Sequence, residues 1–236
     1  MTRRATPPAS DPRARSRTQA GTAAAGAGSS GAGVPRDPAR TLVLASASPR
    51  RRELLEQAGV PHEVMPAGID EQSLPDESAR EMTGRLAREK ALAVARRLTG
   101  DAPRYVLGSD TTVALDGRVF GKPRDAEDAV RLLQALCGRT HVVITAIAVV
   151  DTRSLAVLER VVESRVSLRD AGDDELRAYV GTGEPFDKAG AYAIQGAGGR
   201  LVSRLEGSRT NVIGLPVEET LELLARAGFP LAEADR

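Results

Sequence analysis

The chain has 236 residues, of which 33 are basic and 32 acidic, so its formal net charge is +1. This near balance excludes a nucleic-acid-binding protein that relies on bulk positive charge, and it equally excludes an acidic solvating protein. One cysteine, no tryptophan and only six phenylalanine or tyrosine residues exclude a disulfide framework and leave little material for aromatic platforms that stack bases.

Residues 1–40 differ in composition from the rest of the chain. They are rich in Ala, Gly, Pro and Arg, with only Met1 and Val34 as larger apolar residues, so they bury too little surface to offset the entropy of ordering. We expect a disordered, low-complexity extension, either a dispensable tail or an over-long start, with an Arg-rich transit peptide as the alternative. Residues 41–236 are enough for one α/β domain, and no apolar run approaches the ~18 residues that span a bilayer.

The spacing of apolar residues predicts the elements of this domain. In chain order they are a buried strand at 42–46, a helix at 48–58, a strand at 62–66, a helix at about 77–98, a strand and hairpin at 105–120, a helix at 126–137, two long strands at 140–151 and 155–168, and helices at about 173–181 and 216–227. Glycine-rich loops are expected between the last two helices. The two long strands are expected to pair antiparallel, so the order predicts a mixed-sheet α/β protein.

Polar residues gather where the first strand turns into the first helix. Ser46, Ser48, Arg50 and Arg51 lie within the run ASASPRR. A helix N-terminus offers free backbone N–H groups, and hydroxyls and guanidinium groups beside it suit a phosphate. The alternative is an ordinary serine N-cap with solvated arginines.

Two acidic sites follow other predicted strands. Glu71 ends the run GIDE, and Asp110 lies in GSDT at a position where α/β proteins tend to bind ligands. Asp110 could bind a hard cation or orient a water molecule, whereas the alternative for both sites is a solvated or capped turn.

Lysine is rare in this chain, since only three of the 33 basic residues are lysines. Lys122 lies in GKP just after the hairpin, Lys90 on the long helix, and Lys188 beside Asp187. Each is a candidate for a position that needs a compact ammonium, although Lys90 could be an exposed helix charge and Lys188 could simply pair with Asp187. No P-loop motif is present. The residues together indicate metal-assisted chemistry on a phosphorylated small molecule.

Seven motifs, in order, resemble the Maf family of nucleoside triphosphate pyrophosphatases from about Leu42 to Ala227. They are LASASPRRRELL, GIDE, RLAREKA, VLGSDTTVALDG, GKPRDAEDA, DKAGAYAIQG and TNVIGLP. The resemblance implies a single α/β domain of the Maf/Ham1-like type, with an elongated mixed sheet flanked by helices, a central cleft and often a homodimer. It also implies hydrolysis of a nucleoside triphosphate to the monophosphate and pyrophosphate with a divalent metal cation, Mg²⁺ or Mn²⁺.

The resemblance assigns roles to individual residues. Asp110 is implied as the proton acceptor, and Ser48 and Arg51 as the pair that holds phosphate. The polar lining of the triphosphate site comprises Glu71, Lys90 and Lys122. The residues themselves leave open whether Asp110 takes the proton of the water or binds the metal that activates it, and Glu71 and Asp110 are the candidate metal ligands.

Arg50, Thr111 and Gln195 resemble the dTTP/UTP branch of the family, whereas the branch that acts on 7-methyl-GTP has Trp, Gln and Glu there. A glutamine amide offers one acceptor and one donor, which match the carbonyl and imide N–H of uracil or thymine. We therefore expect a dTTP and UTP pyrophosphatase, acting also on modified pyrimidine nucleotides. The alternatives are the same reaction on 7-methyl-GTP or a purine triphosphate, and a non-catalytic regulator of septum formation.

The expected setting follows from the same comparison and from composition. We expect a cytoplasmic protein, because the single Cys137 suits a reducing compartment. Its partner is a small-molecule nucleoside triphosphate, with no nucleic acid and no membrane. The resemblance further implies a role in keeping modified nucleotides out of nucleic acids and in cell division arrest.

Overall fold

The computed structural model describes residues 41–98 and 104–231. The chain divides into two units, Met1–Val34 and Pro35–Arg236, and every described residue belongs to the second. Residues 1–40, for which the composition predicts disorder, lie outside the described residues.

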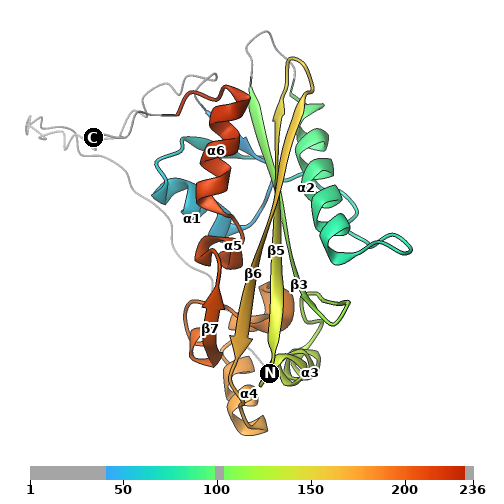
Figure 1. Ribbon diagram of the computed structural model, residues 1–236, viewed down its shortest axis with the longest axis vertical. Coiled ribbons are helices and arrows are strands. Elements are labelled where there is room, and N and C mark those ends of the chain that lie inside the picture. The colour runs from blue at the N-terminus through green and yellow to red at the C-terminus, as the bar shows by residue number, and fades with distance from the viewer. Residues whose placement is uncertain (1–40, 99–103, 232–236) are drawn as a thin grey trace, which may run out of the picture. The chain divides into compact units, whose positions relative to one another are not determined.

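One mixed sheet of seven strands forms the centre of the described residues (Figure 1). The strands are β1 (Leu42–Leu44), β2 (His62–Val64), β3 (Tyr105–Leu115), β4 (Arg118–Phe120), β5 (Thr140–Asp151), β6 (Val157–Leu168) and β7 (Val202–Glu206). Their order is β2-β1-β3-β5-β6-β7, with β4 paired to β3. Strand β1 runs parallel to β2 and β3, and all other pairs are antiparallel. The predicted mixed sheet and the antiparallel pairing of the two long strands are confirmed.

Six α-helices accompany the sheet within the described residues. They are α1 (Pro49–Gln57), α2 (Ala79–Ala95), α3 (Ala126–Leu136), α4 (Asp173–Val180), α5 (Arg209–Ile213) and α6 (Val217–Ala227), with short 3-10 turns at Glu184–Asp187, Ala189–Ala191 and Gly198–Leu201. Helix α2 begins two residues later than predicted, because Ser78 and Glu81 form a capping box there. Its last helical residue is Ala95, three residues before the predicted end.

The segment between α4 and α6 contains structure that the sequence did not predict. Strand β7 and helix α5 occupy part of a stretch expected to be only glycine-rich loops. Both elements have five residues, which is too short for a recognisable apolar period. Ser208 caps α5 by accepting a hydrogen bond from the backbone N–H of Asn211.

Helices cover both faces of the sheet, with α2 on one side and α1 and α6 on the other (Figure 1). Side chains of β5 alternate between these layers. Ala146, Ala148 and Val150 pack in the cluster under α2, whereas Ile147 and Val149 pack in the cluster with α1 and α6. A third apolar cluster joins the other ends of β3, β5 and β6 to α3 and α4. Because small alanines face α2, that helix lies close to the sheet.

Helix α2 approaches β3 tightly at Gly108. A Cβ atom there would lie 2.1 Å from the carbonyl oxygen of Ala87 and 2.7 Å from the backbone nitrogen of Ala91. Only glycine therefore fits at this point of β3. The contact lies two residues before Asp110 and fixes the distance between β3 and the helix that carries Lys90.

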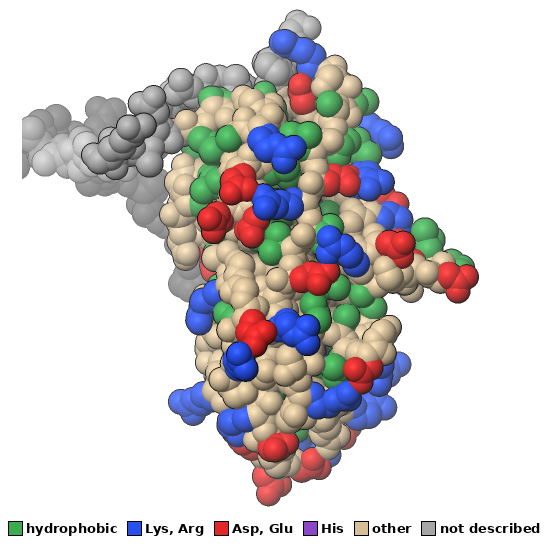
Figure 2. Space-filling view, in the orientation of Figure 1, with side chains coloured by type: hydrophobic (Ala, Val, Ile, Leu, Met, Phe, Trp, Pro, Cys, Tyr) green, Lys and Arg blue, Asp and Glu red, His purple; other side chains and the backbone are tan. Residues whose placement is uncertain are grey.

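The face shown in Figure 2 mixes basic and acidic side chains rather than gathering one sign of charge. Ion pairs connect β6 with the helices on both sides, as in Arg88 with Glu159 and Arg160 with Glu222. No helix within residues 41–98 and 104–231 has the length and apolar content that crossing a bilayer requires.

Replacing Gly108 by alanine tests the close approach of α2. The new methyl group meets backbone atoms, so α2 must move, and we expect a loss of about 2–3 kcal/mol in the free energy of unfolding. The matched control is Gly84→Ala on α2, where the nearest atom to the new Cβ is Val161 Cγ2 at 3.9 Å. That change should stabilise the protein by about 0.5–1 kcal/mol through helix propensity. Urea denaturation measures both, and equal effects would contradict the packing described here.

Candidate active site

A cavity of about 680 Å³ opens beside the middle of β3. It is lined by the turn between β1 and α1, the loop after β2, one side of α2, the middle of β3, the end of β4 with the segment after it, and residues 187–189, 192–195 and 212–214. All nine site residues that the family resemblance implies line it, namely Ser48, Arg50, Arg51, Glu71, Lys90, Asp110, Thr111, Lys122 and Gln195. The lining contains five cationic and three anionic side chains, so its balance of charge suits an anionic ligand.

Lys90 connects two carboxylates on one side of this cavity. Its Nζ donates to Asp110 Oδ1 at 2.7 Å and lies 2.8 Å from Glu71 Oε1. Lys90 and Asp110 are buried, with 8% and 11% of their side chains exposed, whereas Glu71 is exposed at the mouth. Lys90 comes from α2 and Asp110 from β3, so the close helix packing brings them together. The alternative of an exposed helix charge for Lys90 is wrong.

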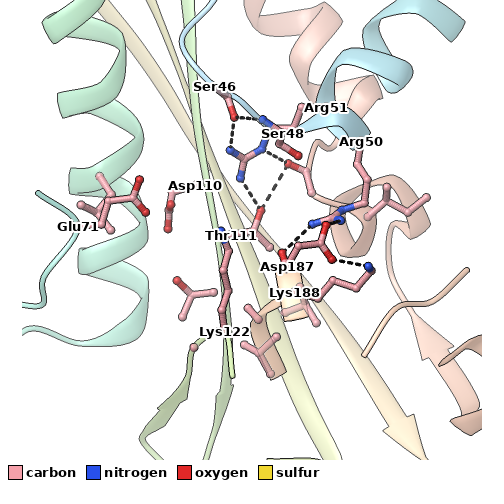
Figure 3. A pocket seen from close by; sticks show the side chains of 18 of the residues that line it. Ser46, Ser48, Arg50, Arg51, Glu71, Asp110, Thr111, Lys122, Asp187 and Lys188 are labelled. Carbon is pink, nitrogen blue, oxygen red and sulfur yellow. Dashed lines mark hydrogen bonds and ion pairs between the residues drawn. The ribbon is translucent and has the colours of Figure 1, made fainter. Parts of the chain in front are cut away.

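The N-terminus of α1 opens onto the opposite wall (Figure 3). Ser48 holds the N-cap position with an extended backbone, and Pro49 begins the helix. The hydroxyl of Ser48 caps no backbone N–H of the helix, so it is not the ordinary serine cap that was the alternative. The backbone N–H of Ser48 donates instead to Ser46 Oγ at 3.2 Å. Ser48 therefore presents its hydroxyl at a helix N-terminus, where anions are stabilised.

Arg51 is buried and donates four hydrogen bonds within the protein. Its Nε reaches the carbonyl oxygen of Gly214 at 2.8 Å, and Nη1 reaches Ser46 Oγ at 2.9 Å and the carbonyl oxygen of Ser109 at 2.8 Å. Its Nη2 reaches Thr111 Oγ1 at 3.1 Å. Because a guanidinium carries five N–H donors, little of it remains for a ligand. Arg51 joins the start of α1, strand β3 and the segment after α5.

Burial and the neighbouring carboxylates shift the pKa of Arg51 in opposite directions. Burial lowers the pKa of Arg51 below its ordinary value, the Asp110 carboxylate opposes this shift, and the charge of Arg50 adds to it. A buried guanidinium in this position raises the positive potential of the wall between β3 and α1.

A second charged cluster lies at the other end of the cavity (Figure 3). Asp187 Oδ2 accepts a hydrogen bond from Arg50 Nη1 at 2.6 Å, and Asp187 Oδ1 accepts one from Lys188 Nζ at 2.5 Å. Burial raises the pKa of the Asp187 carboxyl, but the hydrogen bonds from Lys188 and Arg50 outweigh it, so this pKa lies below its usual 3.8. Lys188 does pair with Asp187, as one alternative held, and Arg50 is a third partner that the sequence did not reveal.

The remaining named residues lie between these clusters. Thr111 Oγ1 is within 3.0 Å of Thr145 Oγ1, which links the Arg51 contacts to the next strand. Lys122 and Gln195 are exposed in the cavity lining. Within residues 41–98 and 104–231, no ion pair involves Lys122, so its ammonium is available to a ligand.

Glu184 is a residue of this region that the sequence analysis missed. Its carboxylate accepts hydrogen bonds from the backbone N–H groups of Ala197 and Gly198 and from the hydroxyl of Tyr179, each at 3.0 Å. These bonds fix the backbone that follows Gln195. No spacing in the sequence indicates them, because two of the three partners are backbone groups.

A buried histidine lies behind the cavity wall. His141 on β5 is 1% exposed, and its Nε2 lies 2.8 Å from the hydroxyl of Tyr192, which lines the cavity. Its Nδ1 has no hydrogen-bond partner among the described residues. Burial lowers the pKa of His141 from 6.5 to about 4, so the imidazole is neutral at pH 7.

The carboxylates give a limited set of metal donors. No group of three or more His, Cys, Asp or Glu side chains that could hold a metal ion occurs within the part of the chain that the structure describes. Glu71 and Asp110 are nevertheless brought to one cation, the ammonium of Lys90. Two carboxylates of this kind fit Mg²⁺, which is usually held by one or two carboxylates together with substrate phosphates and water.

The sequence of the chain is similar to that of known proteins. Residues 41–227 match the sequence model of the family described as Maf-like protein. A dTTP/UTP pyrophosphatase of Anaeromyxobacter dehalogenans is 56% identical over 192 residues, covering 80% of this chain and 95% of that protein. A dTTP/UTP pyrophosphatase of Escherichia coli O157:H7 is 50% identical over 185 residues, covering 78% and 92%. The solved structure of a HAM1 protein from Coxiella burnetii gives a TM-score of 0.38 at 15% identity, covering 79% of this chain and 98% of that protein.

Substitution of Arg51 tests its part in joining the cavity walls. Arg51→Ala leaves the carbonyl oxygens of Ser109 and Gly214 without their buried donor, and we expect a loss of about 3 kcal/mol or more in the free energy of unfolding. The neighbouring Arg52→Ala is the matched control, because its 3.6 Å ion pair with Glu56 is exposed. The control should change stability by less than about 0.5 kcal/mol. Equal losses by guanidinium denaturation would contradict the assignment.

The neutral His141 predicts a pH dependence of stability. Above pH 6.5 neither the folded nor the unfolded imidazole is protonated, whereas between pH 6.5 and about 4 only the unfolded state takes up the proton. The free energy of unfolding should therefore fall as pH is lowered through this window, by on the order of 3 kcal/mol from this residue. Denaturation curves from pH 7 to 4 should show a shallower decline for His141→Gln. Parallel curves for the two proteins would refute the prediction.

Proposed function

The chain belongs to the Maf-like protein family, and we propose that it is a nucleoside triphosphate pyrophosphatase that hydrolyses dTTP and UTP to the monophosphate and pyrophosphate. The observation that carries this proposal is the identity of 50–56% to proteins named dTTP/UTP pyrophosphatase, over 92–95% of their length. All nine residues that the family resemblance implies for the site line a single cavity of this chain. The cavity volume of about 680 Å³ suits a ligand of this size.

The triphosphate binds beside the cationic groups of the cavity that have no carboxylate partner among the described residues. Lys122 makes no ion pair with any described residue, and the N-terminus of α1 presents the Ser48 hydroxyl together with the positive end of the helix dipole. Arg51 contributes mainly through its buried charge, because most of its donors are already used. Together these groups bind and orient the phosphates against β3.

Asp110 accepts the proton of the attacking water. Its Oδ1 accepts the hydrogen bond from Lys90, so the carboxylate is held in one orientation and Oδ2 faces no competing donor among the described residues. Proton removal raises the nucleophilicity of the water as the anhydride between the α- and β-phosphates breaks. Lys90 and Asp110 are both buried, so their ion pair is screened less than one at the surface.

Glu71 would hold a divalent cation, Mg²⁺ or Mn²⁺, together with phosphate oxygens of the substrate, and Asp110 would be its second side-chain ligand in the alternative in which it binds the metal instead of taking the proton of the water. The cation supplies stabilisation of the negative charge that develops on the phosphate oxygens. The Lys90 ammonium lies between the carboxylates of Glu71 and Asp110, where it would offset part of their negative charge. Lys90 thus holds the two carboxylates together before the substrate arrives.

Arg50, Thr111 and Gln195 are the residues we assign to base selection. Gln195 is exposed in the cavity, and Glu184 fixes the backbone next to it. The side-chain amide of Gln195 pairs with the imide edge of uracil or thymine, which cytosine does not have. Arg50 is held in place by Asp187, so its direction is set before the nucleotide binds.

The cellular setting is part of the same proposal. We assign the protein to the cytoplasm, supported by its single, unpaired cysteine, Cys137. The homodimer, the removal of modified pyrimidine nucleotides and the effect on cell division rest on the family resemblance alone.

Pyrophosphate release tests the proposed function. With Mg²⁺ or Mn²⁺ we expect dTTP and UTP to react at least about tenfold faster, as kcat/KM, than CTP, GTP or 7-methyl-GTP, because only the uracil and thymine rings offer the imide edge. EDTA should abolish release. Asp110→Asn should lower kcat by about 100- to 10,000-fold. No release from any nucleotide would refute the enzyme, whereas a preference for 7-methyl-GTP would refute only the substrate assignment.

A further inference from the structure

Glu71 lies on a long irregular loop, so the position of its carboxylate depends on the contacts that hold this loop. Residues 65–78, here called the Glu71 loop, connect β2 to α2 without helix or strand. The stretch 70–76 is entirely exposed, so no apolar side chain there anchors the loop to the core. Met65 and Ala67 at the start of the loop pack against the apolar cluster under α2, but an exposed stretch such as 70–76 samples many conformations unless polar contacts fix it.

Arg85 of α2 supplies such contacts at two points of the Glu71 loop. Its Nη2 donates to the carbonyl oxygen of Gln72 at 3.0 Å, one residue from Glu71. Its Nε and Nη2 donate to the two carboxylate oxygens of Glu77 at 2.6 and 2.7 Å, which is the bidentate geometry of a strong ion pair. The two side chains are 19% and 9% exposed. This pair is therefore better shielded than an ordinary surface ion pair.

The contact with Glu77 extends further along the loop. Glu77 Oε2 also accepts a hydrogen bond from the backbone N–H of Leu74 at 3.1 Å. Arg85 is itself steadied from its own helix by Glu89 at 3.1 Å. At the start of the loop, Arg97 donates to the carbonyl oxygen of Pro66 at 2.7 Å. The guanidinium of Arg85 thus fixes residues 72–77, the part of the loop that directly follows Glu71.

Two other arginines of α2 form ion pairs with the sheet and not with the Glu71 loop. Arg88 pairs with Glu159 and Arg80 with Glu163, and both acidic partners belong to β6. These pairs attach α2 to the sheet and do not contact the Glu71 loop. Arg88 is therefore a matched control for Arg85, being on the same helix and also ion-paired.

We propose that Arg85 is a positioning residue that holds the Glu71 loop against α2, so that the Glu71 carboxylate stays beside Lys90 at the mouth of the cavity. This inference rests on the proposed function, in which Glu71 holds the divalent cation. Arg85 and Lys90 lie on one helix, so the helix fixes both the loop and the ammonium that Glu71 meets. Loss of a residue that orients a metal ligand typically lowers metal affinity or activity by about 10- to 100-fold.

Two measurements on the full-length chain test the inference. Hydrogen exchange of residues 66–78 in the metal-free protein should rise at least about tenfold in Arg85→Ala and in Glu77→Gln, but not in Arg88→Ala. The Mn²⁺ concentration that gives half-maximal pyrophosphate release should rise by about 10-fold or more in the same two variants. Glu77→Gln removes the ion pair without altering α2, so it serves if Arg85→Ala folds poorly.

A double-mutant comparison separates an effect through Glu71 from general destabilisation. If Arg85 acts through Glu71, Arg85→Ala should change the Mn²⁺ dependence of a Glu71→Gln protein by less than about twofold. A full, additive effect in that background would overturn the inference, as would equal exchange in Arg85→Ala and Arg88→Ala. A wild-type protein that releases no pyrophosphate refutes the proposed function separately, because the exchange comparison requires no activity.

Discussion

The burial of one ammonium group between two carboxylates is the constraint on which the cavity depends. An unpaired charge at the position of Lys90 would be costly, so the fold must bring Asp110 and Glu71 to it from a strand and a loop that are distant in the sequence. Helix α2 meets this requirement by lying against β3 at Gly108, where only glycine leaves room. The contact that stabilises the fold therefore also brings together the groups that we propose act on the substrate.

The other walls of the cavity use charge in two different ways. The guanidinium of Arg51 is almost wholly engaged with the protein, where it joins α1 to β3 and to the segment after α5. Arg50 and Lys188 share the carboxylate of Asp187, which keeps both cations ordered at the far end. Lys122 is left without an ion partner among the described residues. The free positive charge is thus concentrated on Lys122 and the N-terminus of α1, which is where the proposed triphosphate meets it.

Sequence reasoning succeeded where a pattern is local and failed where a contact joins distant backbone. Apolar spacing predicted the long strands and helices, and residue type together with the family resemblance predicted which side chains share the cavity. Strand β7 and helix α5 were missed because five residues carry too little periodicity. The bond between Arg50 and Asp187 spans 137 positions, and those of Arg85 and Glu184 end on loop backbone groups, so no spacing could indicate them.

The central claim is that this one cavity binds and cleaves the triphosphate. A crystal structure of the Asp110→Asn variant with dTTP and Mn²⁺ tests it most directly, because anomalous scattering locates the metal. We expect the phosphates to lie between Lys122 and the N-terminus of α1, with the Mn²⁺ peak beside Glu71. Nucleotide density outside the cavity, or a metal peak away from both Glu71 and residue 110, would contradict the claim.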